Sequence, residues 1–384
     1  MSNKPRFVGE KVRLGDVCKA SSLRNKDESC NTVYSVTNSQ GFVPSEEYFS
    51  KEVYSKELKT YRVVDRDMIA YNPSRINVGS VALQNKAERV VVSPLYVVFS
   101  TDSSRLLPDY LVQFLKSKPG LDQIAFQSIG TVRNNLKFKA MCQMELTLPS
   151  VEAQRKRLQK LDSICGQINH AKETIEKLDQ LVKSRFVEMF GNSKFGLIPL
   201  EECCDFIAGG STPSMKHEEF YGGNVPFIKS GDVKGDVVMR GAISLTEAAL
   251  QKGGAKLIPA DSVLVVTRSA LLKTRMHTAL APIPVVINQD IKAFHPKETF
   301  TSNYLMSAIR EREQDLLHGV RSVNTSSIKT SDLYSLPIPV PPLELQQEFA
   351  DFAAQVDKSR FVAQQQIEKL QMLYDSLAQD YFGD

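Results

Sequence analysis

The feature that most constrains this chain is an internal repeat. LPSVEAQ at 148–154 returns as VPPLELQ at 340–346, an offset of 192 residues (340 − 148). The same offset, carried forward without a gap, gives 12 identities over the 45 positions 148–192, where chance would give roughly three. Because 192 is half of the 384 residues, the sequence predicts an architecture that occurs twice.

Each copy of the repeat predicts one long helix. Apolar residues recur at steps of three and four after Pro149 and after Pro341-Pro342, and we expect these prolines in the first helical turn. Each series stops at a glycine, Gly191 or Gly383, after a helix of about 38 residues that spans ~57 Å.

The two apolar stripes predict that the helices pair with each other in an antiparallel arrangement. Packing of each stripe on its own domain is the alternative, and it would be preferred for a single helix. The residues assigned to the pairing are Ile168, Ile175, Leu178, Val182, Val356, Ile367, Leu370 and Leu377.

The segments between the helices correspond more loosely. PDYLVQFLKS at 108–117 resembles SNYLMSAIRE at 302–311, and each predicts a short amphipathic helix. The runs 88–100 and 261–269 have the density of β-branched residues that is typical of strands. We therefore predict an α+β chain, with two α/β domains joined by two long antiparallel helices in a pseudo-two-fold internal repeat. The expected segments are domain 1 at 1–147, helical region 1 at 148–191, domain 2 at 192–335 and helical region 2 at 336–384.

Composition narrows the class of protein. Hydrophobic residues make up 42% and charged residues 24%, as in ordinary globular proteins, and a net charge of +4 permits nucleic-acid binding without requiring it. No run approaches the roughly 18 apolar residues of a membrane-spanning helix, and the first residues do not resemble a signal peptide. The six cysteines form no Cys-x-x-Cys pair, so we expect reduced thiols and a cytoplasmic location.

Motifs for catalysis are missing. No phosphate-binding loop for ATP occurs, and Asn72-Pro73-Ser74-Arg75 lacks the second proline and the aromatic residue of an adenine methyltransferase motif. The five histidines do not have metal-ligand spacing. We therefore expect no catalytic residue, no metal and no cofactor.

Three segments resemble a known family. They are GFVPSEEYFSKEVYSKELKTYRVVDRDMIAYNPSRINVGSVAL at 41–83, IAGGSTPSMKHEEFYGGNVPFIKSGDVKG at 207–235 and LPIPVPPLELQQEF at 336–349. Together with the repeat, they make the whole chain similar to the specificity subunits of Type I restriction–modification systems.

This resemblance implies a DNA-recognition protein without catalysis of its own. Two target-recognition domains would each read one half of a split, non-palindromic site in double-stranded DNA, with the helices as a spacer. The resemblance also implies that the frame holds two methyltransferase subunits, and that restriction/translocase subunits join for cleavage. Two other hypotheses stay open: an enzyme with an unfamiliar site, and a helical scaffold whose domains no longer bind DNA.

DNA recognition needs cations that bind phosphates and polar side chains that meet base edges. In domain 1, such residues follow a predicted strand and recur near 130–135, although plain surface turns would look the same. The candidates there are Tyr71, Asn72, Arg75, Asn77, Arg133 and Asn134.

In domain 2, a glycine-rich segment can bring backbone N–H groups near a phosphate, or it can simply form a turn. Further cations lie at predicted strand ends and predict a basic face. The candidates are Gly210, Ser211, Thr212, Lys229, Ser230, Arg268, Lys273, Arg275 and Arg321.

Overall fold

The chain forms two compact units in this computed structural model. Unit 1 comprises residues 1–172 and 364–384, and unit 2 comprises residues 173–363. The structure describes residues 9–38, 40–48, 57–128, 135–191, 195–273, 275–318 and 327–383.

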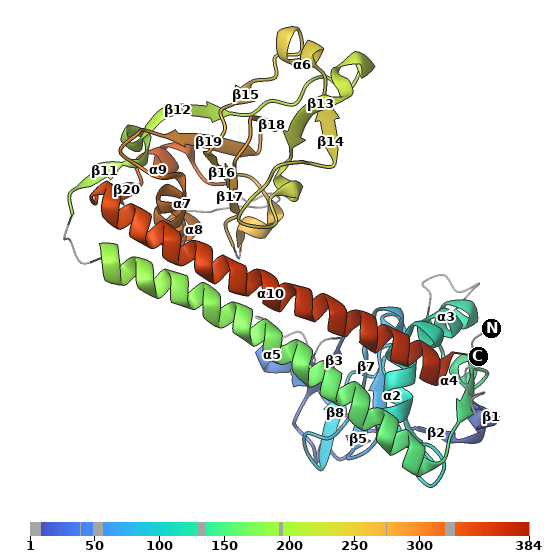
Figure 1. Cartoon of the computed structure of the whole chain (residues 1–384). Coiled ribbons are helices and arrows are strands. Elements are labelled where there is room, and N and C mark those ends of the chain that lie inside the picture. Colours follow the sequence, from blue (N-terminus) through green and yellow to red (C-terminus); the bar gives the residue numbers. More distant parts are fainter. Residues whose placement is uncertain are drawn as a thin grey trace. The chain divides into compact units, whose positions relative to one another are not determined.

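Two 40-residue helices, α5 (Val151–Phe190) and α10 (Leu343–Phe382), each begin in one unit and end in the other (Figure 1). They end directly before Gly191 and Gly383, as predicted. A Cβ atom at position 191 would lie 2.4 Å from the Val187 carbonyl oxygen, so this position requires glycine. The prolines, however, precede the helices and do not occupy their first turns.

The predicted antiparallel pairing of the helices is confirmed in each unit. In unit 1, Arg157 near the start of α5 donates to the Tyr381 carbonyl oxygen near the end of α10, at 3.3 Å. In unit 2, Arg185 near the end of α5 lies 2.9 Å from Glu348 near the start of α10.

Burial along the pairing stripe is graded. Ile168 and Val356 are buried. Val182 packs on the unit 2 core cluster that contains Phe349, and Leu377 packs on the unit 1 cluster that contains Leu158. The remaining assigned positions are half-buried, namely Ile175, Leu178, Ile367 and Leu370.

The central sheets of the two units have one topology. Their strand orders are β2-β9-β6-β7 and β12-β19-β16-β17. Ile69 pairs with Phe99 in unit 1 as Val263 pairs with Phe294 in unit 2, and these pairs define equivalent positions. The strands are β2 (Cys18–Ser21), β9 (Val97–Thr101), β6 (Ile69–Tyr71), β7 (Val81–Leu83), β12 (Cys204–Gly209), β19 (Ile291–Pro296), β16 (Ser262–Val266) and β17 (Thr278–Ala281).

Short helices and a two-stranded ribbon also repeat. The predicted amphipathic helices are present as α2 and α7, and an antiparallel strand pair leads into each long helix. The helices are α2 (Pro108–Lys116), α3 (Lys118–Gln127), α4 (Phe138–Met141), α7 (Ser302–Glu311), α8 (Glu313–His318) and α9 (Thr330–Tyr334). The strand pairs are β1 (Glu10–Arg13) with β10 (Glu145–Leu148) and β11 (Leu197–Pro199) with β20 (Pro337–Pro339).

The outer strands differ between the units. Unit 1 has the separate pairs β3-β4 and β5-β8, whereas unit 2 has one sheet of order β14-β13-β18-β15. These elements are β3 (Tyr34–Thr37), β4 (Gly41–Pro44), α1 (Ser45–Tyr48), β5 (Arg62–Asp65), β8 (Arg89–Val92), β13 (Tyr221–Ile228), β14 (Ile243–Leu245), α6 (Glu247–Gln251), β15 (Leu257–Ile258) and β18 (Val285–Ile287).

A glutamine shared by the two repeats joins each long helix to its unit. Gln154 accepts from the Leu107 backbone N–H at 2.9 Å and donates to the Arg105 carbonyl at 2.6 Å. Gln346, its repeat partner, accepts from Thr301 N–H at 2.9 Å and donates to the Thr299 carbonyl at 3.0 Å. Both side chains are fully buried. The identity therefore reflects one joint that is built twice.

Candidate nucleic-acid interface

The first candidate loop follows β6. Tyr71 is fully buried, its hydroxyl donates to the Leu136 carbonyl at 3.1 Å, and burial raises its pKa. The prediction that Tyr71 contacts DNA is therefore not retained. Arg75 and Asn77 are exposed, whereas half-buried Asn72 accepts from the Ser74 backbone N–H at 3.0 Å and caps the turn.

This loop packs against the chain that follows the second candidate loop. The Leu136 N–H donates to the Pro73 carbonyl at 3.1 Å, and the Ser74 hydroxyl donates to the Asn135 side chain at 3.2 Å. Arg133 and Asn134 themselves lie outside the described residues. The structure thus brings the ends of both predicted loops of unit 1 together.

Unit 2 repeats this arrangement after β16. The Ile328 N–H donates to the Thr267 carbonyl at 2.9 Å, and Arg268 forms a backbone bridge with Ser327. Thr267 is equivalent to Pro73 by sheet register. Arg321 lies outside the described residues, in the gap before Ser327. The same two segments therefore meet in both units.

The glycine-rich segment is structural. A Cβ atom at Gly210 would lie 2.2 Å from the carbonyl oxygens of Ile287 and Asn288. The N–H groups of Gly210 and Ser211 donate to Ile291 and Ile287, and the Ser211 hydroxyl donates to Gly254 at 2.9 Å. Because these donors have protein acceptors, the prediction that Gly210 and Ser211 hold a phosphate is not retained. Thr212 is exposed.

The turn Asn288–Asp290 forms hydrogen bonds with residues in or next to three of the predicted segments of unit 2. The Thr212 hydroxyl donates to the Gln289 side-chain oxygen at 2.6 Å, and the Asn288 N–H donates to Ile228, next to Lys229. The Asp290 carbonyl accepts from Thr267 N–H at 2.8 Å. Sequence reasoning missed this turn, although a polar triplet between the apolar runs VVI and IKAF was a usable signal.

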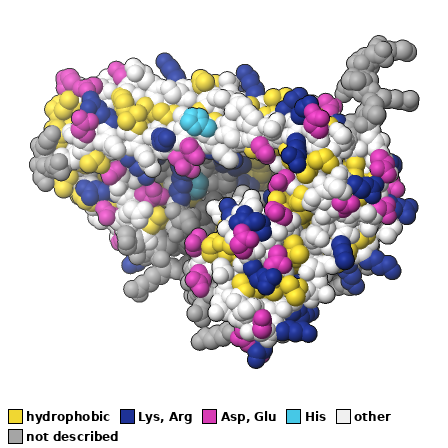
Figure 2. All heavy atoms as spheres, turned by 90° about the horizontal axis from the view of Figure 1, so that it is seen from below, with side chains coloured by type: hydrophobic (Ala, Val, Ile, Leu, Met, Phe, Trp, Pro, Cys, Tyr) yellow, Lys and Arg dark blue, Asp and Glu magenta, His cyan; other side chains and the backbone are white. Residues whose placement is uncertain are grey.

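The remaining cations of unit 2 are dispersed around this turn. Lys229 and Ser230 are half-buried, with the Lys229 ammonium 5.7 Å from the centre of the Phe227 ring. Arg275 is exposed, and for Lys273 the backbone alone is described. On the face drawn in Figure 2, described Lys and Arg side chains are interspersed with Asp and Glu. Charges of both signs are therefore mixed on the face that Figure 2 shows.

Unit 1 has an apolar turn at the equivalent place. By register, Ser93–Leu95 corresponds to Asn288–Asp290, and Leu95 is 80% exposed. Arg62 donates to the Pro94 carbonyl at 3.2 Å and to the Ser21 carbonyl at 3.3 Å, which ties this turn to the end of β2.

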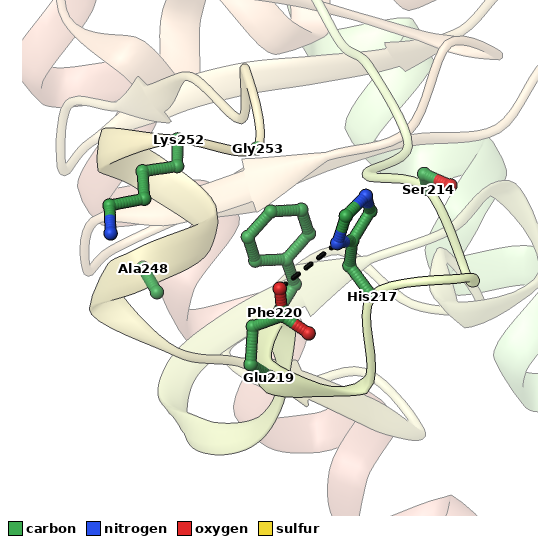
Figure 3. Close-up of a pocket in the computed structure, with 7 residues that line it drawn as sticks. All are labelled: Ser214, His217, Glu219, Phe220, Ala248, Lys252 and Gly253. Atoms are coloured by element: carbon green, nitrogen blue, oxygen red, sulfur yellow. Dashed lines mark hydrogen bonds and ion pairs between the residues drawn. The ribbon is translucent and has the colours of Figure 1, made fainter.

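A shallow pocket of about 420 Å³ lies beside the glycine-rich segment of unit 2 (Figure 3). The His217 and Phe220 rings lie 5.0 Å apart, and His217 Nδ1 is 2.9 Å from Glu219 Oε1. In Figure 3, Lys252 lies on the other side of Phe220 from His217. The pocket lining mixes a cation, an acid and an imidazole.

Other kinds of site are scarce among the described residues. Among the described residues, none of the helices has the length and apolarity to cross a membrane, and His, Cys, Asp and Glu do not gather into a group of three that could bind a metal ion. Burial raises the pKa of the Cys203 and Cys204 thiols to about 12, so these thiols stay protonated near neutral pH.

Comparisons with known proteins agree with this arrangement. The family model for the Type I restriction modification DNA specificity domain matches residues 9–180 and 192–372. The Type I restriction enzyme EcoR124I/EcoR124II specificity subunit of Escherichia coli is 34% identical over 39% of this chain, but the match spans only 38% of that protein. The putative type I restriction enzyme MjaX specificity subunit of Methanocaldococcus jannaschii is 22% identical over 80% of this chain and 76% of its own length.

Solved structures share the fold. The Type-I restriction-modification S subunit from M. genitalium matches all of this chain and 98% of its own, with a TM-score of 0.55 and 12% identity. A chain from a structure concerned with complex assembly and conformational transition of the type I R-M system matches 98% of this chain and 99% of its own, with a TM-score of 0.59 and 18% identity.

Proposed function

This chain belongs to the family of Type I restriction–modification DNA specificity subunits and has two target-recognition domains, and we propose that each domain reads one half of a bipartite, asymmetric DNA site. The observation that carries the proposal is the pair of equivalent strand-end turns with different side chains. Unit 1 exposes Leu95 where unit 2 has the polar turn around Gln289. One frame with two unlike reading surfaces suits a site whose halves differ.

Polar and cationic residues of the candidate segments are the proposed DNA contacts. Arginine suits guanine edges or phosphates, and asparagine suits adenine. The proposed set is Asn72, Arg75, Asn77, Arg133 and Asn134 for the first half-site, and Thr212, Lys229, Ser230, Arg268, Lys273, Arg275 and Arg321 for the second.

We further propose that the helices act as spacer and docking frame. A 40-residue helix spans ~60 Å, more than one DNA turn of ~34–36 Å. A pseudo-two-fold frame offers two equivalent surfaces, which suits two methyltransferase subunits, with restriction/translocase subunits added for cleavage. Catalysis then belongs to these partners in the cytoplasm, and this chain supplies recognition without a cofactor of its own.

The test is co-purification with the methyltransferase encoded beside this chain, followed by mapping of methylated adenines in host DNA. A split motif with a fixed gap is expected. A stable complex that methylates without any motif would favour a helical scaffold instead. Methylation or cleavage by the purified chain alone would contradict the absence of catalysis.

Exchange of domain 1, residues 1–147, for that of another specificity subunit tests modularity. The first half of the motif should change while the second half stays. Arg75→Ala and Arg268→Ala form a matched pair on the wild-type frame, and each should weaken methylation through one half-site alone. A change in both halves from any of these substitutions would contradict the modular assignment.

A further inference from the structure

The turn between β18 and β19 holds an amide side chain in a fixed orientation at the surface. Gln289 is exposed at its tip. Asn288 Nδ2 donates to Asp290 Oδ2 at 3.0 Å, and the Ile291 N–H donates to the Asn288 carbonyl at 3.2 Å. These bonds close the turn, so the backbone beneath Gln289 is pre-organised.

The amide itself is oriented by Thr212. The Thr212 hydroxyl donates to Gln289 Oε1 at 2.6 Å, which uses one of the two lone pairs of this oxygen. No described residue accepts a hydrogen bond from Gln289 Nε2. The side chain therefore retains one acceptor site and two donor hydrogens, side by side.

Two cations belong to the segments around this turn. The Arg268 guanidinium, 58% exposed, lies 3.9 Å from Asp290. Lys292 follows in β19, and a Cβ atom at Gly209 would lie 2.7 Å from its Nζ. Cations near an exposed amide can bind backbone phosphates and bring the amide against a base edge.

We infer that Gln289 reads an adenine in the major groove of the second half-site, with Oε1 accepting from N6 and Nε2 donating to N7. This inference rests on the proposed function. Adenine presents this acceptor–donor pair in the major groove, and a bidentate glutamine matches it. Thr212 is then a positioning residue, because it fixes which end of the amide faces N6.

The test uses the complex of the full chain with its methyltransferase and a panel of duplexes with one substituted base pair each. For Gln289→Ala, discrimination at one A·T pair of the second half should fall roughly 10- to 100-fold, with the first half and the gap unchanged. Gln289→Glu should prefer C·G at that pair, because a carboxylate accepts from cytosine N4. Thr212→Val should give a smaller loss at the same pair. Gln143→Ala, an exposed glutamine of unit 1, is the control and should retain the wild-type motif.

The outcomes separate this inference from the proposed function. Wild-type complex without a split motif would contradict the proposed function. A wild-type motif that Gln289→Ala and Gln289→Glu both leave unchanged would overturn the inference alone. Equal weakening of all duplexes would also overturn it, since a phosphate contact behaves in that way.

Discussion

Near the start of each long helix, equivalent positions of the repeat make contacts of different chemical kinds in the two units. In unit 1, Arg157 lies 4.7 Å over the Tyr381 ring and donates to the Tyr110 hydroxyl at 2.8 Å. Its repeat partner in unit 2 is Phe349, which meets Phe186 and Phe190 edge-on at 5.4 and 5.6 Å. The repeat thus conserves the backbone and exchanges a cation for an aromatic ring.

At a second pair of equivalent positions, the apolar residue is in unit 1 and the cation is in unit 2. Ile168 is 7% exposed in unit 1, whereas its repeat partner Arg360 pairs with Asp179 at 2.6 Å and also with Asp236. Arg310 of α7 contacts Asp236 at 2.7 Å, so the ion pairs connect α10 to the recognition domain of unit 2. These exchanges give each long helix different contacts in the two units.

The largest expected effect on stability is at the aromatic cluster around Phe349. Phe349→Ala should lower the free energy of unfolding by about 3–5 kcal/mol, because it opens a cavity among buried rings. Arg157→Ala should cost about 1–2 kcal/mol, through two hydrogen bonds, to the Tyr110 hydroxyl and the Tyr381 carbonyl, and one cation–π contact. Denaturant titration with hydrogen exchange would assign each loss to its unit. Equal losses for the two variants would contradict the difference between Phe349 and Arg157.

The glutamine joints should behave alike. Gln154→Ala and Gln346→Ala should each cost about 2–3 kcal/mol, because each removes the acceptor of a part-buried N–H and the donor to a buried proline carbonyl, that of Pro149 or Pro341. Thermal or denaturant unfolding of the two variants side by side would check this. A difference above about 1 kcal/mol would show that the joints are not equivalent.

The ion pairs of Asp236 with Arg310 and Arg360 predict a smaller effect on stability, which depends on pH. Burial opposes ionisation of Asp236, but Arg310 and Arg360 outweigh it and hold its pKa below the ordinary 3.8. Its contribution is therefore present above about pH 4 and is lost as the pH falls through the lowered folded-state pKa.

Arg360→Met should cost about 1–2 kcal/mol at neutral pH, a figure reduced because the Arg360 side chain is 25% exposed. The variant should also weaken the loss of unit 2 stability on acidification below pH 4, as followed by hydrogen exchange. An unchanged acid profile would assign the acid sensitivity to other carboxylates.

The smallest effect on stability is expected at the exposed turn of unit 1. Leu95→Ser should change the free energy of unfolding by less than about 0.5 kcal/mol, as should the exposure-matched control Met372→Ser. If the two turns have the same role, Leu95→Ser alone should alter the first half of the methylated motif. An unaltered motif would mean that, of the two equivalent turns, only the one in unit 2 contributes to base recognition.

The repeat predicted the frame well because long apolar periodicity and paired identities report backbone geometry directly. It predicted both helices, their C-terminal ends and their pairing, but not that the prolines precede the first turns. It did not foresee Arg360, since a charged residue interrupts the apolar stripe and two of its acidic partners, Asp179 and Asp236, lie far away in sequence.

The site was harder to predict because strand-end turns look alike in sequence. Tyr71 and Gly210 were chosen by residue type. In the structure, Tyr71 is buried and Gly210 packs closely against the backbone of another strand end. Gln289 was overlooked because its importance depends on Thr212, 77 residues earlier in the chain. Sheet register, which brings such residues together, is not visible in one sequence.

The crossing of the helices between units has a consequence for synthesis on the ribosome. Ala378 and Phe382 belong to the core of unit 1, and the Phe382 ring lies 5.0 Å from Tyr110, yet both are translated after all of unit 2. At ~5–20 residues per second, the first-made domain waits roughly 10–40 s for its last apolar side chains. The domain translated second can therefore complete its core before the domain translated first.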